Sequence, residues 1–428
     1  MTSQRGTAEC AETSELPPRA PLITLGLLVL LCWRIPKHFF WADEWGFLVA
    51  FSDFGSVSWN APHSGHVFPL FKALYACILS LWGAEAYAFH AASLLVWWGI
   101  GVASFRIARK VLNQDRLALL LAAVVVTHPV NSTAILWSFE LCISVQLLLQ
   151  LLALESVLRG PQNPNLLALG SLLLCQNFFF ANGAFFPLVC LAVPGAWRRD
   201  RAILCGALSA LFVSLQLAVS GGRISSSVPE LAVNWLAYTV TTIGRLSFMY
   251  ERIFGSWVVV PALVVFGVVL LAARNTRGWR TLLFLVVWFI AASAAVVAGR
   301  GADAASGSRL YYTTLTFLPV MLTMVWAFSN VASVSAIRSI TRPAVLLVIV
   351  GLFMTISQRA VSVFSSRSVM NATAMQSAIA AGVRWVPFDD PVIDSRAGMH
   401  VDADDAKRAL MYWTEHGLLA RFRPSPSR

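Results

Sequence analysis

Two acidic side chains stand side by side soon after the first long apolar run of the sequence. Asp43 and Glu44 lie in HFFWADEWGFL, residues 38–48, among aromatic residues. Charged residues are scarce in this chain, so a carboxylate pair beside an apolar run requires an explanation. One interpretation is a general base whose pKa is set by partial burial. The other is a solvated loop next to a belt of interfacial aromatic residues.

A pair of histidines follows in the same polar segment. His63 and His66 enclose the sequence HSGH, which precedes an apolar stretch with Lys72 inside it. An imidazole can bind a substrate, carry a proton or coordinate a metal ion. The surrounding sequence offers too few further ligands for a metal centre, so we expect none, and nothing in the sequence supports a divalent cation. Ordinary hydrogen-bonded histidines are the alternative interpretation.

One more histidine and one more acid stand at the junction of two later apolar runs. His128 ends the first of these runs, in His128-Pro129, and Glu140 lies near the start of the second. A carboxylate at the end of a membrane helix is expected to face the protein interior or a wet cavity. A solvated acid at a helix end is the alternative.

The segment GRGADAASGSRLYY, residues 299–312, combines two arginines with two tyrosines. Arg300 and Arg309 precede Tyr311 and Tyr312. The planar guanidinium group suits phosphate, which favours an anionic ligand. Contact with lipid headgroups beside a tyrosine belt is the alternative. Further candidates on the outer side are Gln176, Asn177, Asn182, Arg223, Arg245, Glu251 and Arg252. The polar residues that flank Phe178–Phe180 have two interpretations, a groove for a sugar or lipid and an ordinary helix break.

The composition indicates that these residues belong to a protein of the lipid bilayer. Hydrophobic residues make up 57% of the 428 residues and charged residues 12%, about half the charged share of a soluble domain. So few charges cannot cover a surface in water, which predicts an all-α polytopic membrane protein. The net charge of +11 comes from short arginine clusters between apolar runs. That pattern is typical of cytoplasmic loops and excludes a nucleic-acid partner.

Apolar runs of suitable length predict about eleven transmembrane helices. They are 21–40, 86–105, 117–131, 135–157, 165–180, 183–197, 202–220, 256–273, 281–298, 310–330 and 343–360. The first run is expected to stay as a helix, because no signal-peptidase site follows it. With a cytoplasmic N-terminal tail, the basic clusters all fall on the cytoplasmic side. These clusters are at 106–116, 159, 198–201, 274–280 and 338–342.

This topology requires that 67–82, VFPLFKALYACILSLW, does not cross the membrane. Its proline near the start and its internal Lys72 favour a helix that lies on the outer interface. The chain then divides into a cytoplasmic tail, 1–20, a transmembrane domain, 21–360, and an extracytoplasmic C-terminal segment, 361–428. The acidic pair and the interfacial helix share the first outer loop, 41–85, and the further outer segments are 221–255 and 299–309.

Taken in order, these segments resemble the GT-C superfamily of integral-membrane glycosyltransferases. The resemblance is to the branch of protein-mannosyltransferase-like and aminoarabinose-transferase-like enzymes. Its features are a first helix, an outer acidic pair, an H-x-x-P-L interfacial helix, a helix ending at His128-Pro129, an acid on the next helix and a late S-R-x-Y-Y loop. They cover residues 40–330, and the C-terminal segment lies outside the resemblance.

The resemblance implies a GT-C-like bundle and an inverting transfer of one sugar from a polyprenyl-phosphate carrier, without a cofactor. The acceptor would be an envelope glycan, such as O-antigen or another surface polysaccharide, or a lipid, on the outer face of the cytoplasmic membrane. Asp43 would be the base, with Glu44 as its support. The set expected to bind substrate is His63, His66, Lys72, His128, Glu140, Arg300, Arg309, Tyr311 and Tyr312. Many relatives have an acid or lysine directly before the proline turn, where this chain has His66-Val67-Phe68.

Two other classes of protein stay open. A flippase or transporter of lipid-linked sugars would place charged or broken helices near the middle of the bilayer. Here the unusual polar residues gather near the outer helix ends, which favours the enzyme. A non-catalytic GT-C-like scaffold subunit is the third class, and the presence of Asp43, Glu44 and Arg309 argues against it. The sequence does not indicate an oligomeric state.

Overall fold

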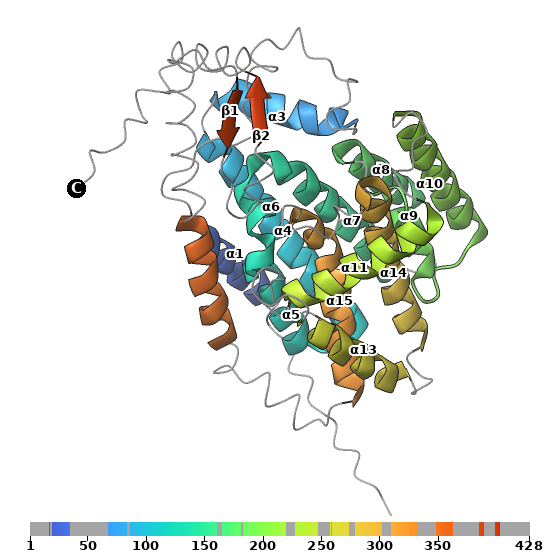
Figure 1. Cartoon of the computed structure of the whole chain (residues 1–428). Helices are drawn as coiled ribbons and strands as arrows, with labels where there is room; N and C mark the ends of the chain where they lie inside the picture. Colours follow the sequence, from blue (N-terminus) through green and yellow to red (C-terminus); the bar gives the residue numbers. More distant parts are fainter. Residues whose placement is uncertain are drawn as a thin grey trace, which may run out of the picture.

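The computed structural model of the chain is a bundle of packed helices (Figure 1). The structure describes residues 17, 19–34, 67–83, 86–160, 165–180, 183–219, 227–246, 257, 259–273, 279–301, 310–331, 348–362, 385–388 and 399–402. The first half contains α1 (Ala20–Trp33), α3 (Pro69–Trp82), α4 (Ala86–Leu112), α5 (Asp115–Thr127), η2 (Pro129–Asn131), α6 (Ser132–Leu136), η3 (Ser138–Glu140) and α7 (Leu141–Arg159). The second half contains α8 (Leu166–Phe179), α9 (Phe186–Ala192), α10 (Arg199–Val219), α11 (Val228–Leu246), α13 (Val259–Ala273), α14 (Trp279–Arg300) and α15 (Leu310–Val331). A further helix, Val348–Ser362, is called the 348–362 helix.

The prediction of an all-α protein holds for the bundle but needs one addition. In the C-terminal segment β1 (Trp385–Phe388) pairs antiparallel with β2 (Met399–Asp402). Both strands are short and contain valine, and β1 also contains two aromatic residues, which are residue types that favour strands.

The protein is a multi-pass membrane protein, because several helices are long and apolar enough to cross a bilayer. Within the described residues four helices qualify, namely Ala86–Leu112, Ser138–Arg159, Arg199–Ala218 and Trp279–Ala298. A fifth span results if Asp115–Thr127 and Pro129–Leu136, which are bent by 43° from each other, count as one. Five shorter apolar helices of 10–17 residues, among them α1, α3 and α8, are also present. The predicted number of about eleven spans is therefore not confirmed.

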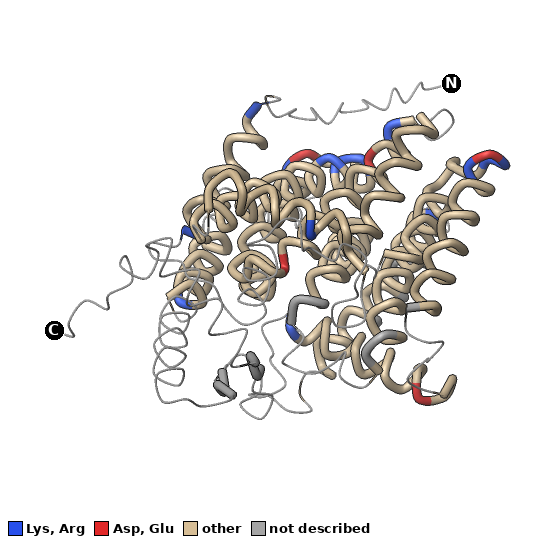
Figure 2. The backbone as a smooth tube through the Cα atoms, turned by 90° about the horizontal axis from the view of Figure 1, so that it is seen from above, with Lys and Arg blue, Asp and Glu red and all other residues tan. Residues whose placement is uncertain are grey.

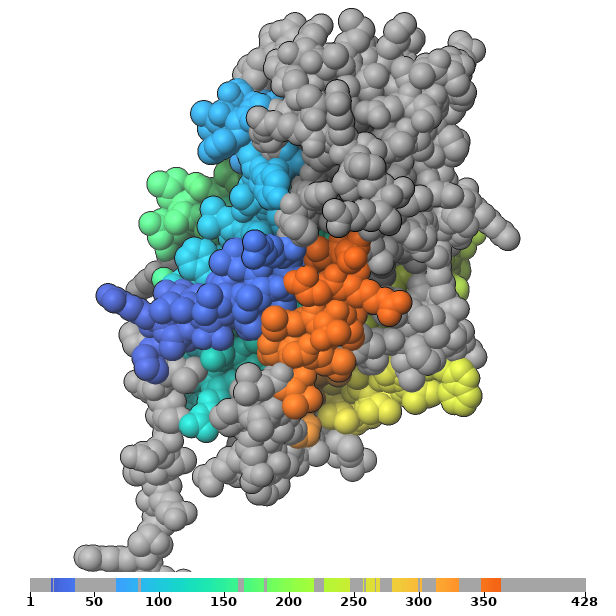
Figure 3. Space-filling view, turned by 90° about the vertical axis from the view of Figure 1, so that its left-hand side faces the viewer, coloured from blue at the N-terminus to red at the C-terminus, as the bar shows by residue number. Residues whose placement is uncertain are grey.

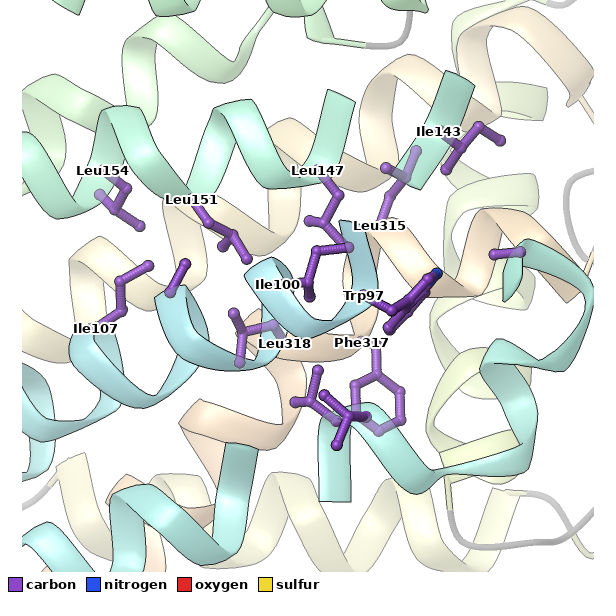
Figure 4. Close-up of a cluster of buried hydrophobic side chains, with 14 of the residues drawn as sticks. Trp97, Ile100, Ile107, Ile143, Leu147, Leu151, Leu154, Leu315, Phe317 and Leu318 are labelled. Carbon is purple, nitrogen blue, oxygen red and sulfur yellow. The ribbon is translucent and has the colours of Figure 1, made fainter. Parts of the chain in front are cut away.

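The centre of the bundle is built where α4, α7 and α15 meet. Side chains from all three helices point toward one another in Figure 4, among them Ile100, Leu147 and Leu318. Each is at most 2% exposed. Ile100 and Ile107 recur after seven residues on α4, which keeps them on one face of the helix. Trp97 donates from Nε1 to the Ser144 hydroxyl at 3.1 Å, a polar contact between α4 and α7 inside an apolar core.

Basic residues mark one end of this bundle. Arg109 and Lys110 lie in the last turn of α4, Arg159 lies in the last turn of α7, and Arg199 begins α10. Figure 2 shows that Lys and Arg gather along one edge of the molecule. We call this edge the basic end and the other side the opposite end. The described basic clusters at 106–116, 159 and 198–201 thus lie at one end of the bundle, whereas the cytoplasmic location assigned to this end remains a prediction.

A helix that the sequence analysis did not predict covers α14 and α15. Residues 221–255 were assigned to an outer segment, whereas α11 is a 19-residue helix within it. Figure 1 shows α11 running across α14 and α15. Trp235 donates to the Ser293 hydroxyl of α14 at 2.7 Å, and the Tyr238 and Thr316 hydroxyls lie 3.1 Å apart. Polar contacts therefore fix α11 to the bundle.

The 348–362 helix closes the bundle against α1. The two helices lie side by side on the face drawn in Figure 3. Gln358 donates from Nε2 to the backbone carbonyl of Cys32 at 3.1 Å. Ser357 donates to the carbonyl of Thr127 at 2.8 Å, which links the same helix to the end of α5. The last carbonyls of a helix have no hydrogen-bond donor within that helix. Ser357 and Gln358, from a distant part of the chain, supply donors to two such carbonyls.

Candidate functional site

The structure describes some of the residues proposed from the sequence with their side chains, some by their backbone only, and others not at all. Asp43, Glu44, His63, His66 and Arg309 lie outside the described residues. For Arg300, Tyr311 and Tyr312 the structure gives the helical backbone, at the end of α14 and in the first turn of α15. The side chains of Lys72, His128 and Glu140 are described, and the site is built from them and their surroundings.

An aromatic cluster joins the first turn of α3 to η3. The rings of Phe68 and Phe71 lie 6.2 Å and 5.7 Å from the ring of Phe139, edge to face in both cases. Pro69 begins α3, where a proline costs no hydrogen bond and its fixed φ suits the helix. The aromatic contacts therefore bring α3 against the start of the candidate span Ser138–Arg159.

Two buried charged residues, from motifs that are far apart in the sequence, directly follow members of this cluster. Lys72 follows Phe71 on α3, and Glu140 follows Phe139 on η3. Lys72 is 6% exposed and Glu140 is 2% exposed. Burial lowers the pKa of the Lys72 amine below its ordinary value, because leaving water disfavours its charged form. A buried ammonium of this kind is stabilised by any anion that binds beside it.

His128 holds the backbone together at the junction between α5 and η2. Its Nδ1 accepts from the amide of Val130 at 3.1 Å, so the ring proton is on Nε2. Nε2 then donates to the carbonyl of Leu246, the last residue of α11, at 3.2 Å. The ring also packs between Phe317 and Phe353, at centroid distances of 5.0 Å and 5.2 Å. With both nitrogens in use, the His128 ring ties α11 to η2 and offers neither nitrogen to a substrate.

Further hydrogen bonds link the region around His128 to the first turns of α15. Asn131 donates to the carbonyl of Val125 at 2.9 Å and accepts from the Thr314 hydroxyl at 3.1 Å. Arg245 is fully buried and donates from Nη1 to the Thr313 hydroxyl at 3.2 Å. Thr313 lies in the first turns of α15, directly after the predicted arginine-tyrosine segment. Arg245 was only one of several weak candidates in the sequence, because α11 itself was not predicted.

The polar residues around Phe178–Phe180 act as a helix break. Gln176 donates to the carbonyl of Gly183 at 3.0 Å and accepts from Gln150 at 2.8 Å. Gln146 donates to the carbonyl of Phe180 at 2.8 Å. Asn177 donates back into α8, to the carbonyl of Leu173 at 3.2 Å. Of the two interpretations for Gln176 and Asn177, the described side chains fit the helix break and not a sugar or lipid groove.

The end of α1 belongs to the same region of the bundle. Trp33 donates from Nε1 to the carbonyl of Val126 at 2.6 Å, and the carbonyl of Trp33 lies 2.9 Å from Nε2 of His90. Residue 34 leads into the outer loop with the acidic pair, and Leu310 follows the arginine-containing loop. The chain therefore enters or leaves three predicted site segments close to the ends of α1, α5 and α11.

Among the side chains that the structure describes, no group of three or more His, Cys, Asp or Glu residues is arranged to hold a metal ion.

Comparison with known proteins identifies similar solved structures, among them two of ArnT. No protein-family model and no curated protein matches the chain. ArnT from Cupriavidus metallidurans bound to undecaprenyl phosphate is 14% identical over 93% of this chain and 77% of that chain, with a TM-score of 0.46. The apo state of ArnT from the same organism is 13% identical over 72% and 76%, with a TM-score of 0.32. These similarities concern the course of the chain and not its activity.

Proposed function

We propose that the chain is an inverting GT-C-type glycosyltransferase. It moves a monosaccharide from a polyprenyl-phosphate carrier to an envelope glycan or lipid, on the outer face of the cytoplasmic membrane. The observation that carries this proposal is the junction of α3 with η3. It brings the buried Lys72 and Glu140, from two separate motifs, to one aromatic cluster at the end of a membrane span.

The location of this junction supports a site at the opposite end of the bundle. α5 begins close to the last turn of α4, at the basic end, and so its last residue, Thr127, lies at the opposite end. The hydrogen bonds of Trp33, His128 and Asn131 gather the ends of α1 and α11 and the first turns of α15 around it. These are the elements from which the segments with Asp43 and Arg309 depart.

The proposed chemistry needs one base and several cations. Asp43 takes the proton of an acceptor hydroxyl while its oxygen attacks the anomeric carbon from the side opposite the phosphate. The bond between the anomeric carbon and the phosphate oxygen breaks, and the polyprenyl phosphate leaves with the electron pair. Lys72, Arg300 and Arg309 stabilise the negative charge of the leaving phosphate, which is a strong effect in a site of low dielectric constant. Glu44 supports the base, and Tyr311, Tyr312, His63, His66 and Glu140 contact the sugar.

In this proposal His128 has a different role from the one expected. Its nitrogens are occupied by Val130 and Leu246, so it positions η2 and α11 and does not bind the sugar. Substrate contact is left to the other residues of the predicted set.

The flippase alternative is less well supported by the described helices. The buried charged side chains of α7 are Glu155, in its last turns, and Glu140, directly before its first residue. A transporter would be expected to place such groups near the middle of its spans. Charges at helix ends suit a site that opens to one side of the membrane.

The direct test uses purified protein in lipid nanodiscs. It would be incubated with a panel of polyprenyl-phosphate monosaccharides and an envelope extract, and mass spectrometry would follow donor loss and product mass. We expect Asp43→Asn to lower turnover by about two to three orders of magnitude. Asp53→Asn makes the same chemical change in the same outer loop and is expected to leave turnover unchanged.

The possible outcomes separate the three classes. Full activity of Asp43→Asn in a folded protein would refute the assigned base. Donor movement across vesicles without any new product would favour the flippase. Donor binding in the wild type without turnover, for every donor and acceptor fraction tested, would favour the scaffold subunit.

A further inference from the structure

The basic end of the bundle contains two arginines that share one buried acid. Arg106, near the end of α4, donates from Nη1 to Oε1 of Glu155 at 3.4 Å. Arg159, in the last turn of α7, donates from Nη2 to the same oxygen. The Glu155 side chain is 6% exposed, whereas those of Arg106 and Arg159 are 43% and 61% exposed. The acid thus holds two guanidinium groups from different helices side by side near the surface.

This arrangement leaves donors and positive charge for an external anion. Each guanidinium group has five N–H donors, and the contact with Glu155 uses one nitrogen of each. One carboxylate cannot neutralise two cations, and Arg109 and Lys110 add two exposed positive charges within a turn of Arg106. Arginine pairs bind phosphate oxygens through parallel hydrogen bonds, which makes a phosphate the best-fitting ligand.

Other basic segments of the chain, together with the start of α8, indicate that this phosphate belongs to a lipid. Trp197 is 72% exposed directly before Arg198, and the guanidinium group of Arg280 lies 5.7 Å from the ring centre of Trp279, which is 53% exposed. Exposed tryptophans beside arginines are typical of a membrane interface. α8 begins shortly after Arg159 and exposes 81% of Leu167 in its first turn, an apolar surface for an acyl chain.

We propose that Arg106 and Arg159 bind the headgroup phosphate of one anionic phospholipid at the end of α4 and α7. Arg109 and Lys110 raise the local positive charge, and Glu155 keeps the two guanidinium groups at phosphate spacing. The lipid belongs to the leaflet at the basic end, which the positive-inside rule assigns to the cytoplasm, where anionic lipids attract basic residues. This site is independent of the proposed transfer reaction at the opposite end.

The experiment compares lipids in nanodiscs and in detergent. Wild-type protein would be titrated with phosphatidylglycerol and with phosphatidylcholine of the same chains, and native mass spectrometry would count the lipids retained. We expect phosphatidylglycerol to be retained and to raise the thermal unfolding midpoint more than phosphatidylcholine. Arg106→Gln/Arg159→Gln should weaken that binding roughly thirtyfold.

The matched control is Arg198→Gln/Arg280→Gln, which removes the same charge from basic segments outside the site. It should retain phosphatidylglycerol like the wild type. Removing both arginines leaves Glu155 buried without its partners and can unfold the protein. The triple variant Arg106→Gln/Glu155→Gln/Arg159→Gln removes the acid as well, changes the net charge by one only, and should still lose the lipid.

Three results would overturn the proposal. Equal loss in the site variant and the control would mean that total charge, and not this site, attracts the lipid. Undiminished binding in the triple variant would place the lipid elsewhere. Inorganic phosphate that raises the unfolding midpoint in phosphatidylcholine nanodiscs, and does so only while Arg106 and Arg159 are present, would identify a soluble anion as the ligand.

Discussion

At Gly183 the absence of a side chain decides how α8 ends. A Cβ atom at this position would lie 2.0 Å from Oε1 of Gln176 and 2.6 Å from Nε2 of Gln146. Both amides are fully buried and bonded to the break between α8 and α9. Glycine therefore allows the backbone to approach a polar cluster that a larger residue would force apart.

This close approach gives a prediction for Gly183→Ala. The Gln176 amide must move, which breaks its buried hydrogen bonds with Gln150 and Gly183 and lowers the free energy of unfolding by about 1–3 kcal/mol. The effect would be read as a lower midpoint of thermal unfolding in detergent. Gly206→Ala on α10 is the control, because nothing lies within 4 Å of its Cβ and a helical alanine is expected to be neutral or slightly stabilising. Equal midpoints for the two variants would contradict the strain at Gly183.

Among the helices, α11 shows why a search for long apolar runs does not find every helix. Its inward side chains, at 235, 238, 242 and 245, follow helical spacing but include a threonine and an arginine. Polar side chains on this face bond to hydroxyl groups of α14 and α15. A helix held by polar contacts has no long apolar run, so only its periodicity and its start signal identify it.

The start signal of α11 is a capping box that predicts a dependence on pH. The Ser227 amide donates to Oε2 of Glu230 at 2.7 Å, the reciprocal contact of Ser-x-x-Glu helix starts. Hydrogen bonds from Ser227 lower the pKa of the Glu230 carboxyl below its ordinary value. A lowered pKa in the folded state means that this stabilisation is present above the unfolded pKa and is lost as pH falls through the folded pKa.

We therefore expect the first turn of α11 to open as the pH falls below the ordinary pKa of a glutamate carboxyl, about 4.3. Hydrogen exchange, corrected for the intrinsic chemical rate at each pH, would report this opening as reduced protection of the first turn of α11. Glu230→Gln keeps a capping acceptor without the titration, so its protection should change less with pH. The same pH dependence in both proteins would assign the opening to another group.

For the whole molecule, the separation of charge predicts its orientation in the membrane. Lys110 lies in the last turn of α4 at the basic end, whereas Glu230 lies in the first turn of α11, which packs on α14 and α15. In intact cells a membrane-impermeant maleimide should label Glu230→Cys but label Lys110→Cys only after permeabilisation. Both variants need Cys77→Ser, because Cys77 is exposed. The reverse labelling pattern would invert the proposed topology and move the transfer site to the cytoplasm.

Composition and spacing were sufficient to predict the class of this protein and much of its helical order. The shortage of charge required a membrane protein, and the ranges around 86–105, 135–157, 281–298 and 310–330 recur as α4, α7, α14 and α15. The helix at 67–82 recurs as α3, and its interfacial position remains a prediction. Such features follow from local hydropathy, which each segment carries by itself.

Tertiary structure alone decided which polar residues meet. His128 has a structural role because the carbonyl of Leu246, 118 residues away, accepts a hydrogen bond from its Nε2. Gln176 became part of a helix break because Gln150 and Gly183 face it. The segments that carry Lys72 and Glu140 meet because Phe68 and Phe71 contact Phe139. In an apolar interior each polar group must find a partner, and that partner is selected by packing between helices, which no single segment of the sequence encodes.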